Sequence, residues 1–235
     1  MVSLQEFLAN EYICQSDLNI YDTPKGEGLV TQAATGRHLQ VVSICEDTAI
    51  EVCLCEDNYP GWLLAKDSSS LQLADSQYNA IALARSQSFA FSPAEIKFQL
   101  PEVIDFTNQA MQQANYYLWG GTVAPNYDCS GLIQAAFKSV GVWLPRDAYQ
   151  QEAFTQKTSF EELLPGDLVF FGSIEKATHV GLYLGEACYI HSSGQKQGRN
   201  GIGIDKLSDG GDEVSKLYYQ QLRGFGRVIS SYGAH

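Results

Sequence analysis

Cys129 stands in the stretch NYDCSG at residues 126–131, where a nucleophilic side chain coincides with a predicted helix start. Apolar residues recur at helical spacing over 129–141, with Asp128 as the expected N-cap and Gly141 as the expected C′ residue. The unpaired N–H groups and positive dipole end of a helix stabilise a thiolate in the first turn, which should lower the pKa of Cys129. Because the Asp128 carboxylate opposes this effect, a nucleophilic Cys129 still needs a general base.

The base for this thiol should be a histidine, and the chain has four. His38 falls in the acidic N-terminal region and His235 is the last residue. His179 and His191 remain, and each lies on a predicted strand of the second half of the chain. These two are therefore the candidates for a Cys–His–His relay, in which His179 takes the thiol proton and His191 orients His179 through its other ring nitrogen.

The turn between these two strands decides whether the two rings can cooperate. A two-residue loop at 185–186 would place His179 and His191 on opposite faces of the hairpin. A three-residue loop at 185–187 would pair Gly181 with His191 and place both rings on one face. The relay requires the shared face, so we predict the longer loop.

The elements that carry these residues form an α+β pattern. Residues 1–75 contain short strand-like stretches and turns, which predict a small barrel-like β domain, and residues 76–100 have the composition of a connector. A helix is predicted from Pro101, and the helix after Asp128 follows it. Strands are predicted at 167–171, 178–185, 188–193 and 224–229. Helices followed by antiparallel strands predict one α+β domain over 101–235.

Composition and charge limit the class of protein. The chain has 235 residues, of which 45% are hydrophobic, so a packed core is feasible. Its formal net charge is −12, which argues against nucleic acid or an anionic membrane as the main partner. No apolar run approaches the roughly 20 residues of a membrane-spanning helix, and no secretory signal is visible. We therefore expect a cytoplasmic protein, unless a leader has been removed.

The chain has six cysteines, and the missing signal favours reduced thiols. Cys53 and Cys55 form a C-x-C pair that would point to one face of a strand. A zinc site would need two more ligands, and His38 is the only histidine before residue 179. We interpret the pair as apolar strand residues, and we expect neither a metal nor a cofactor.

The C-terminal part, from about residue 100 to residue 235, resembles the NlpC/P60 family of papain-like cysteine peptidases, which cut cell-wall peptides. Six stretches occur in the family's order: YLWGG (117–121), YDCSG (127–131), LPRDA (144–148), LLPGDLVFF (163–171), THVGLYLG (178–185) and YIHSS (189–193). The first 75 residues are similar to a bacterial SH3-like module, mainly at YPGWLLAKDSSSLQL (59–73). The whole arrangement looks like the γ-D-glutamyl-L-diamino-acid endopeptidases that recycle murein peptides.

The resemblance implies a fold and a catalytic set. The fold would be a small SH3-like barrel followed by a papain-like domain, with helices packed on an antiparallel sheet. Cys129 aligns with the family's nucleophile, His179 with its base and His191 with its third polar residue. Cys129 would attack the carbonyl of the γ-D-Glu–diaminopimelate bond to give a thioester. The Cys129 N–H and a group near Tyr117 would stabilise the oxyanion.

The resemblance also implies substrate contacts. Enzymes of this group require a free N-terminal L-Ala, and Asp147 should bind its α-amino group, although a surface salt bridge would also explain this residue. Asp128 and Ser130 would contact the peptide. Tyr59 would form part of the cleft wall, or would only pack in the SH3-like core. For Arg146 a substrate contact and a plain ion pair remain open. The expected partner is a murein tri- or tetrapeptide, and the expected state is a monomer.

Three other functions remain open at this stage. The chain could be an exported hydrolase of the same catalytic type that acts on intact murein. It could be a non-catalytic module that uses its SH3-like part for wall or protein recognition. It could also use the same thiol for amidase or acyl-transfer chemistry, because related folds support several reactions.

Overall fold

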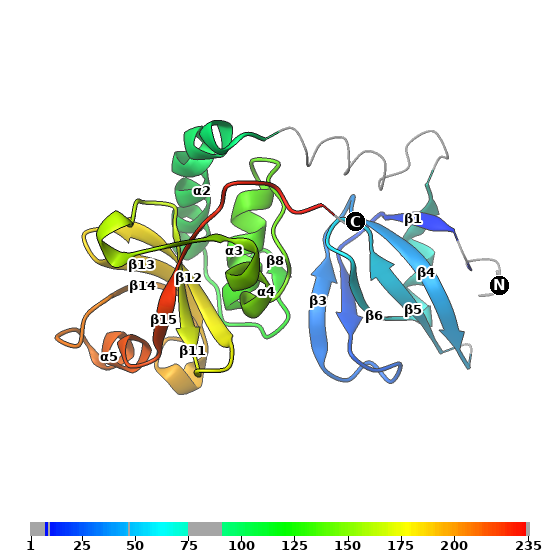
Figure 1. Cartoon of the computed structure of the whole chain (residues 1–235). Helices are drawn as coiled ribbons and strands as arrows, with labels where there is room; N and C mark the ends of the chain where they lie inside the picture. The colour runs from blue at the N-terminus through cyan, green and yellow to red at the C-terminus, as the bar shows by residue number, and fades with distance from the viewer. Residues whose placement is uncertain (1–7, 9, 47, 75–90, 234–235) are drawn as a thin grey trace.

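The computed structural model describes residues 8, 10–46, 48–74 and 91–233, which form two domains lying side by side (Figure 1). Most of the predicted connector (76–90) and His235 lie outside the described residues. Within the described ranges, none of the helices is both long enough and apolar enough to cross a membrane.

The N-terminal domain is one curled, seven-stranded antiparallel sheet with strand order β3-β2-β6-β5-β4-β1-β7. Its elements are β1 (Glu11–Cys14), β2 (Leu18–Tyr21), β3 (Leu29–Ala33), β4 (His38–Cys45), β5 (Ala49–Leu54), β6 (Tyr59–Leu64), the 3₁₀ helix η2 (Ala65–Ser70) and β7 (Leu71–Leu73). Alternate residues point inward, so that Ile20, Val52 and Leu63 are fully buried in a common core. Burial of each such side chain contributes about 1.5–3 kcal/mol.

The first helix of the C-terminal domain, α2 (Pro93–Gln112), begins eight residues before the predicted start at Pro101. Ser92 and Glu95 form a capping box, in which the Ser92 N–H donates to Glu95 at 2.7 Å and the Glu95 N–H donates to Ser92 at 3.3 Å. Pro93 occupies the first turn, where a missing N–H costs nothing. The prediction was wrong because it treated Pro101 as a start, whereas Pro101 lies inside the helix.

The C-terminal domain contains a six-stranded antiparallel sheet with order β10-β15-β11-β12-β13-β14. After α2, its elements are β8 (Thr122–Val123), β9 (Asn126–Tyr127), α3 (Cys129–Lys138), α4 (Ala148–Phe154), β10 (Gln156–Thr158), η3 (Phe160–Glu162), β11 (Leu168–Gly172), β12 (Ala177–Gly185), β13 (Cys188–Ser193), η4 (Gln195–Gln197), β14 (Gly201–Lys206), α5 (Glu213–Tyr219) and β15 (Leu222–Arg227). The predicted α+β pattern of helices and an antiparallel sheet is therefore present.

Helices cover both faces of this sheet, and each face has its own core. One face packs against α2 and α3 in a core that includes Ile133, Phe137 and Phe170. The other face packs against α5 in a core that includes Phe171 and Tyr218. In Figure 1, α3 and α4 lie between the sheet and the N-terminal domain. The start of α3 is thus placed where both domains meet.

Hydrogen bonds join the two domains at this boundary. The Gln32 side chain, on β3, accepts from the Thr122 N–H at 3.0 Å, and the Gln134 side chain, on α3, donates to Asp57 at 2.9 Å. The Arg37 guanidinium, which pairs with Asp57, lies over the Trp143 ring at 5.1 Å. These contacts hold β3 against β8 and the segment between β5 and β6 against α3.

Candidate active site

Cys129 is the first residue of α3, as the sequence predicts, and Asp128 is the N-cap. The Gly131 N–H donates to the Asp128 carboxylate at 2.6 Å, which satisfies one of the free donors of the first turn. The helix ends at Lys138 with Ser139 as C-cap, so Gly141 (φ +82°), the predicted C′ residue, stands one position beyond C′. Cys129 itself is 7% exposed.

The glycines near Cys129 make room for backbone rather than for a substrate. A Cβ on Gly131 would lie 2.0 Å from the Gly121 carbonyl oxygen. A Cβ on Gly120 would lie 2.6 Å from the carbonyl oxygen of Leu29, which belongs to β3 of the N-terminal domain. The missing side chains of Gly120 and Gly131 therefore let the helix start pack against a loop and against the other domain.

The thiol is protonated at rest. Burial and the neighbouring Asp128 carboxylate raise the pKa of Cys129 to about 12, and N–H donors from Val180 and Ser130 only partly offset them. The predicted lowering of this pKa is therefore wrong, because desolvation outweighs the helix start. A base close to the thiol is correspondingly necessary.

The turn between β12 and β13 differs from the predicted three-residue loop at 185–187. Glu186 and Ala187 form a two-residue loop with φ of 52° and 55°, and Gly185 pairs with Cys188. Positive φ at both central positions is the geometry of a type I′ turn, whose twist matches that of the strands. The loop is therefore one residue shorter than predicted.

A bulge just before Gly185 compensates for the shorter loop. Beyond the bulge, Leu182 pairs with Ile190, which is the register that the three-residue loop was expected to give. His179 and His191 consequently share the face that packs against α5. The Nε2 atom of His179 lies 2.6 Å from Nδ1 of His191.

Burial keeps both imidazoles neutral. Desolvation and the neighbouring His191 hold the pKa of His179 well below its usual range. Desolvation also lowers the pKa of His191, and the hydrogen bond to the Asp205 carboxylate only partly opposes it. The Tyr218 ring stacks on His179 with ring centroids 4.3 Å apart. A neutral imidazole is the form that can accept a proton from a thiol.

The thiol and the histidines meet at residue 180 of β12. Cys129 and Val180 belong to the same buried cluster, and the Val180 N–H lowers the pKa of the thiol, so the thiol lies near the residue that follows His179. Among the described residues, no hydrogen bond joins the thiol to His179 itself; such bonds often tighten only when substrate is bound. Because Nε2 of His179 contacts His191, Nδ1 is its remaining nitrogen.

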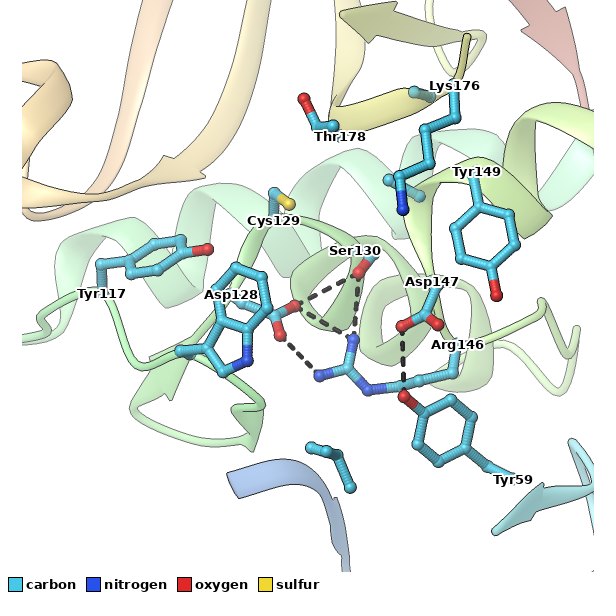
Figure 2. Close-up of a pocket in the computed structure, with 14 residues that line it drawn as sticks. Tyr59, Tyr117, Asp128, Cys129, Ser130, Arg146, Asp147, Tyr149, Lys176 and Thr178 are labelled. Atoms are coloured by element: carbon cyan, nitrogen blue, oxygen red, sulfur yellow. Dashed lines mark hydrogen bonds and ion pairs between the residues drawn. The ribbon is translucent and has the colours of Figure 1, made fainter. Parts of the chain in front are cut away.

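A pocket of about 260 Å³ opens beside the thiol. It is lined by Val30, Tyr59, Tyr117, Trp119, Asp128, Cys129, Ser130, Arg146, Asp147, Ala148, Tyr149, Lys176, Ala177 and Thr178. All six residues predicted to bind substrate line this pocket together with the nucleophile. Figure 2 shows Tyr117 beside Cys129, with its hydroxyl turned toward that residue. In the part of the chain that the structure describes, neither the Tyr117 hydroxyl nor the Cys129 N–H has an assigned hydrogen-bond partner, so both donors expected at the oxyanion are available.

Arg146 makes a buried ion pair with Asp128, which was one of its two predicted roles. Its two terminal nitrogens lie 3.1 and 2.5 Å from the two Asp128 oxygens. The same guanidinium donates to Ser130 at 3.0 Å and to Thr31 of the N-terminal domain at 3.0 Å. The Gly120 N–H also donates to Asp128. Asp128 and Arg146 are thus occupied by protein groups and hold the helix start, which leaves them little capacity for a peptide.

Asp147 has different surroundings. Its carboxylate accepts a hydrogen bond from the Tyr59 hydroxyl at 3.4 Å, and no Lys, Arg or His within the described ranges pairs with it. Burial raises the pKa of Asp147, while the nearby Arg146 charge partly opposes this. The surface salt bridge considered for Asp147 is therefore absent from the described structure. Tyr59 packs partly against the N-terminal core and also reaches this pocket, so both of its predicted roles apply.

Sequence reasoning missed several residues of this region, including Trp119, Tyr149, Lys176 and Asp205. Trp119, Tyr149 and Lys176 line the pocket, and the Lys176 ammonium lies 5.5 Å from the centre of the Tyr149 ring. Asp205 lies behind the histidines, with its carboxylate 2.7 Å from Nε2 of His191. Trp119 lies within a matched family stretch and was detectable there, whereas Asp205 carries no motif that would have marked it.

The C-x-C pair stands apart from this site. Cys53 is half-buried at the end of β5 and Cys55 is buried just after it. Burial raises the pKa of both thiols, so neither is a ready metal ligand. The described residues contain no group of three His, Cys, Asp or Glu side chains arranged to hold a metal ion.

Two family models match this chain. Residues 114–221 match the NlpC/P60 family, and residues 20–67 match the bacterial dipeptidyl-peptidase Sh3 domain. The chain is 38% identical over 112 residues to the probable endopeptidase p60 of Listeria seeligeri, which covers 48% of this chain and 19% of that protein. It is 35% identical over 134 residues to the bifunctional muramidase/DL-endopeptidase CwlT of Bacillus subtilis (strain 168), which covers 53% of this chain and 37% of that protein.

The chain thus spans well under half the length of these two relatives. A crystal structure of an NlpC/P60 family protein from Bacillus cereus ATCC 10987 aligns over 96% of this chain and 66% of its own, with 23% identity and a TM-score of 0.50. That likeness concerns the fold. Taken with the two family models, it establishes that this chain carries an NlpC/P60 domain at residues 114–221, preceded by a bacterial SH3 domain at residues 20–67.

Proposed function

We propose that this chain is a cysteine endopeptidase that hydrolyses the γ-D-glutamyl–meso-diaminopimelate bond of murein peptides with a free N-terminal L-Ala. The observation that carries the proposal is the Asp147 carboxylate, which faces the pocket of Cys129 without a cationic protein partner among the described residues. A partly buried carboxylate gains most from an ammonium group, because the two charges compensate each other's desolvation.

The charges in the pocket favour a zwitterionic ligand. Arg146 and Asp128 compensate each other, whereas Asp147 and Lys176 have no ion-pair partner in the described structure. Figure 2 draws Lys176 on the opposite side of the pocket from Tyr59, with its ammonium group reaching toward Ser130. A peptide of L-Ala and γ-linked D-Glu offers an ammonium at its first residue and an α-carboxylate at its second. These two charges match those that the protein leaves uncompensated.

The N-terminal domain supports a short substrate. Val30 and Tyr59 come from that domain and line the same pocket as Cys129. The Tyr59–Asp147 hydrogen bond lies across the domain boundary at the side where the peptide's amino end would lie. We therefore propose free tri- or tetrapeptides as substrates and the cytoplasm as the place of action.

The reaction would proceed through a thioester. His179 Nδ1 takes the proton of the Cys129 thiol as the sulfur attacks the γ-carbonyl carbon of D-Glu, and the oxyanion accepts from the Cys129 N–H and the Tyr117 hydroxyl. The C–N bond then breaks, and the imidazolium returns the proton to the leaving amino group of diaminopimelate. Water, deprotonated by His179, attacks the thioester and releases L-Ala-γ-D-Glu with the free thiol.

The first test compares L-Ala-γ-D-Glu-meso-diaminopimelate with propionyl-γ-D-Glu-meso-diaminopimelate, in which a propionyl group replaces L-alanyl. The two peptides differ only in the amino group. We expect the free amine to be cleaved at least 100-fold faster in kcat/KM by the wild type, and Cys129→Ala to cleave neither peptide. In Asp147→Asn, kcat/KM for the free amine should fall while kcat/KM for the propionyl peptide stays the same. Most of the preference is then lost. Equal cleavage of the two peptides by the wild type would remove the role of Asp147, and cleavage of neither would remove the activity.

The second test concerns the place of action. Purified protein is incubated with whole sacculi and with the free tripeptide at matched concentrations of the scissile bond. We expect release from sacculi to be at least 100-fold slower than cleavage of the tripeptide, because uncleaved stems lack a free L-Ala amine. Comparable rates would instead indicate a hydrolase of intact wall.

A further inference from the structure

The Asp205 carboxylate lies at the end of a buried chain of two imidazoles. Asp205, on β14, is 3% exposed and His191 is fully buried. Nε2 of His191 lies 2.7 Å from Asp205, and Nδ1 of His191 lies 2.6 Å from Nε2 of His179. Asp205 therefore contacts neither the pocket nor the thiol, and any effect that it has on the reaction passes through the histidines.

Hydrogen-bonding capacity leaves one arrangement of protons in this chain. An ionised carboxylate can only accept, so Nε2 of His191 carries a proton. Since a neutral imidazole has one N–H, Nδ1 of His191 carries a lone pair and accepts from Nε2–H of His179. The single proton of His179 is then on Nε2, and its Nδ1 is left with a lone pair. That is the nitrogen required to take the proton of Cys129.

The protein keeps Asp205 ionised. Nε of Arg199 donates to Asp205 Oδ2 at 2.9 Å, its Nη2 forms an ion pair with Oδ1, and the Ser215 hydroxyl donates to Oδ1 at 3.4 Å. Burial alone would raise the pKa of Asp205, but the bonds from His191 and Arg199 hold it well below its usual range. Arg199 lies over Gly203, where a Cβ would be 2.8 Å from its Cδ. Gly203 pairs with His191 in the sheet, so the missing side chain leaves room for this guanidinium.

We propose that Asp205 is a positioning residue that fixes the Nε2–H tautomer of both His191 and His179 and so keeps Nδ1 of His179 free as the base. The proposal rests on the proposed peptidase function for its kinetic part only. The alternative is a purely structural role, in which Asp205 and Arg199 tie β14 to the segment before α5 and have no effect on the imidazole protons.

Replacement of Asp205 by leucine separates these roles. Asparagine would not, because Oδ2 of Asp205 faces both Nε2 of His191 and Nε of Arg199, so an amide oxygen at that place could still accept from His191. Leucine offers no acceptor, so Nε2–H of His191 is no longer favoured, and His191 can carry its proton on Nδ1 and donate it to Nε2 of His179. In that state the proton of His179 lies on Nδ1, and the base is lost.

The kinetic test uses the free tripeptide. We expect Asp205→Leu to lower kcat at least tenfold with KM changed less than threefold, because the tautomer is no longer fixed and the imidazolium formed in the reaction loses a nearby carboxylate. Adding Arg199→Met to Asp205→Leu removes the unpaired guanidinium, and kcat should stay low. A purely structural pair predicts instead that the double variant, in which both charges are replaced by apolar side chains, recovers kcat. The proposal fails if Asp205→Leu keeps kcat within threefold of the wild type, or if the double variant regains the wild-type kcat.

The spectroscopic test does not depend on activity. The two histidines are labelled with ¹⁵N in the Cys129→Ala background, and the ring-nitrogen shifts at neutral pH report which nitrogen carries hydrogen. We expect Nε2–H on both rings, and a clear population of Nδ1–H on both rings after Asp205→Leu. Nδ1–H on His179 in the parent protein overturns the proposal even if the leucine variant fails to fold. If no peptide is cleaved but the tautomers are as expected, the peptidase function fails and the positioning role stands.

Discussion

Asp128–Arg146 and Asp205–Arg199 are both carboxylate–arginine pairs of the C-terminal domain, but their remaining bonds go to different kinds of group. Asp128 also accepts from the backbone N–H groups of Gly120 and Gly131. Asp205 also accepts from His191. The first pair therefore holds the backbone around the start of α3, and the second is joined to the imidazoles of the proposed relay.

The comparison teaches that the role of a buried charge depends on what its other bonds contact. Arg146 is 2% exposed, and its Nε reaches Thr31 of the other domain, so its loss leaves Asp128 buried without a cation and loosens the domain boundary. The Arg199 side chain is 29% exposed, and its loss leaves Asp205 with His191 and Ser215. Removal of the two arginines should consequently have different effects.

The largest expected difference is in stability. Arg146→Met should lower the free energy of unfolding by about 3–5 kcal/mol, because an unpaired carboxylate stays buried. Arg199→Met should lower it by less, about 1–3 kcal/mol, because Asp205 is also buried but His191 beside it can take up a proton and replace part of the lost positive charge. Urea unfolding followed by circular dichroism measures both, with the wild type alongside. Equal losses of unfolding free energy in the two variants would mean that the Asp205–Arg199 pair stabilises the fold as much as the Asp128–Arg146 pair does. The two pairs would then not differ in role.

The sequence predicted the positions of Cys129, His179 and His191 because each lies in an element with a clear local signal. Asp128 is an N-cap type followed by helical spacing, and the strands around the histidines have strong β character. The turn was less predictable. Glu186 and Ala187 are not residues that favour positive φ, so the type I′ loop and its compensating bulge had no local signature.

Asp205 escaped prediction because its strand inverts the usual pattern. Ile204 is 39% exposed, whereas Asp205, beside it on β14, is buried. Alternation of apolar and polar residues assigns the apolar face to the core, so it places this carboxylate in solvent. Only the tertiary partners His191 and Arg199 make the buried position favourable. The charge distribution of the pocket could likewise not be predicted, because Asp147 and Lys176 are far apart in sequence and only the fold brings them to one pocket.

The pH dependence of kcat sharpens the comparison, since the imidazoles beside Asp205 can titrate, whereas the Arg146 guanidinium beside Asp128 does not. Arg146 stays charged, because the Asp128 partner raises its pKa despite burial. His179 must be neutral to act, and burial holds its pKa well below 6.5. At pH 5.5 an ordinary histidine would be only about one tenth neutral, which would lower kcat about tenfold. We expect a fall of less than threefold between pH 7.5 and pH 5.5.

That profile is measured as kcat with saturating tripeptide, so that the bound amine keeps Asp147 ionised. Circular dichroism at each pH controls for unfolding, because the lowered histidine pKa values reduce stability as the pH falls below 6.5. A tenfold loss of kcat in folded protein at pH 5.5 would show that His179 titrates as an exposed imidazole, and that the relay is not sealed from solvent.

The smallest expected effect concerns Tyr59, through which the SH3 domain contacts the Asp147 carboxylate. Tyr59→Phe removes one long hydrogen bond to Asp147, of 3.4 Å, and leaves both charge pairs intact. We expect KM for the free tripeptide to rise about threefold with kcat unchanged, which is the scale of one weak hydrogen bond. Tyr21→Phe is the matched control, because it removes a hydrogen bond of the same length, to Asn19, in the same domain and outside the pocket. A change in kcat rather than KM would contradict a role of Tyr59 in binding the amine. It would indicate instead that Tyr59, like Arg146, helps to hold Cys129 in place.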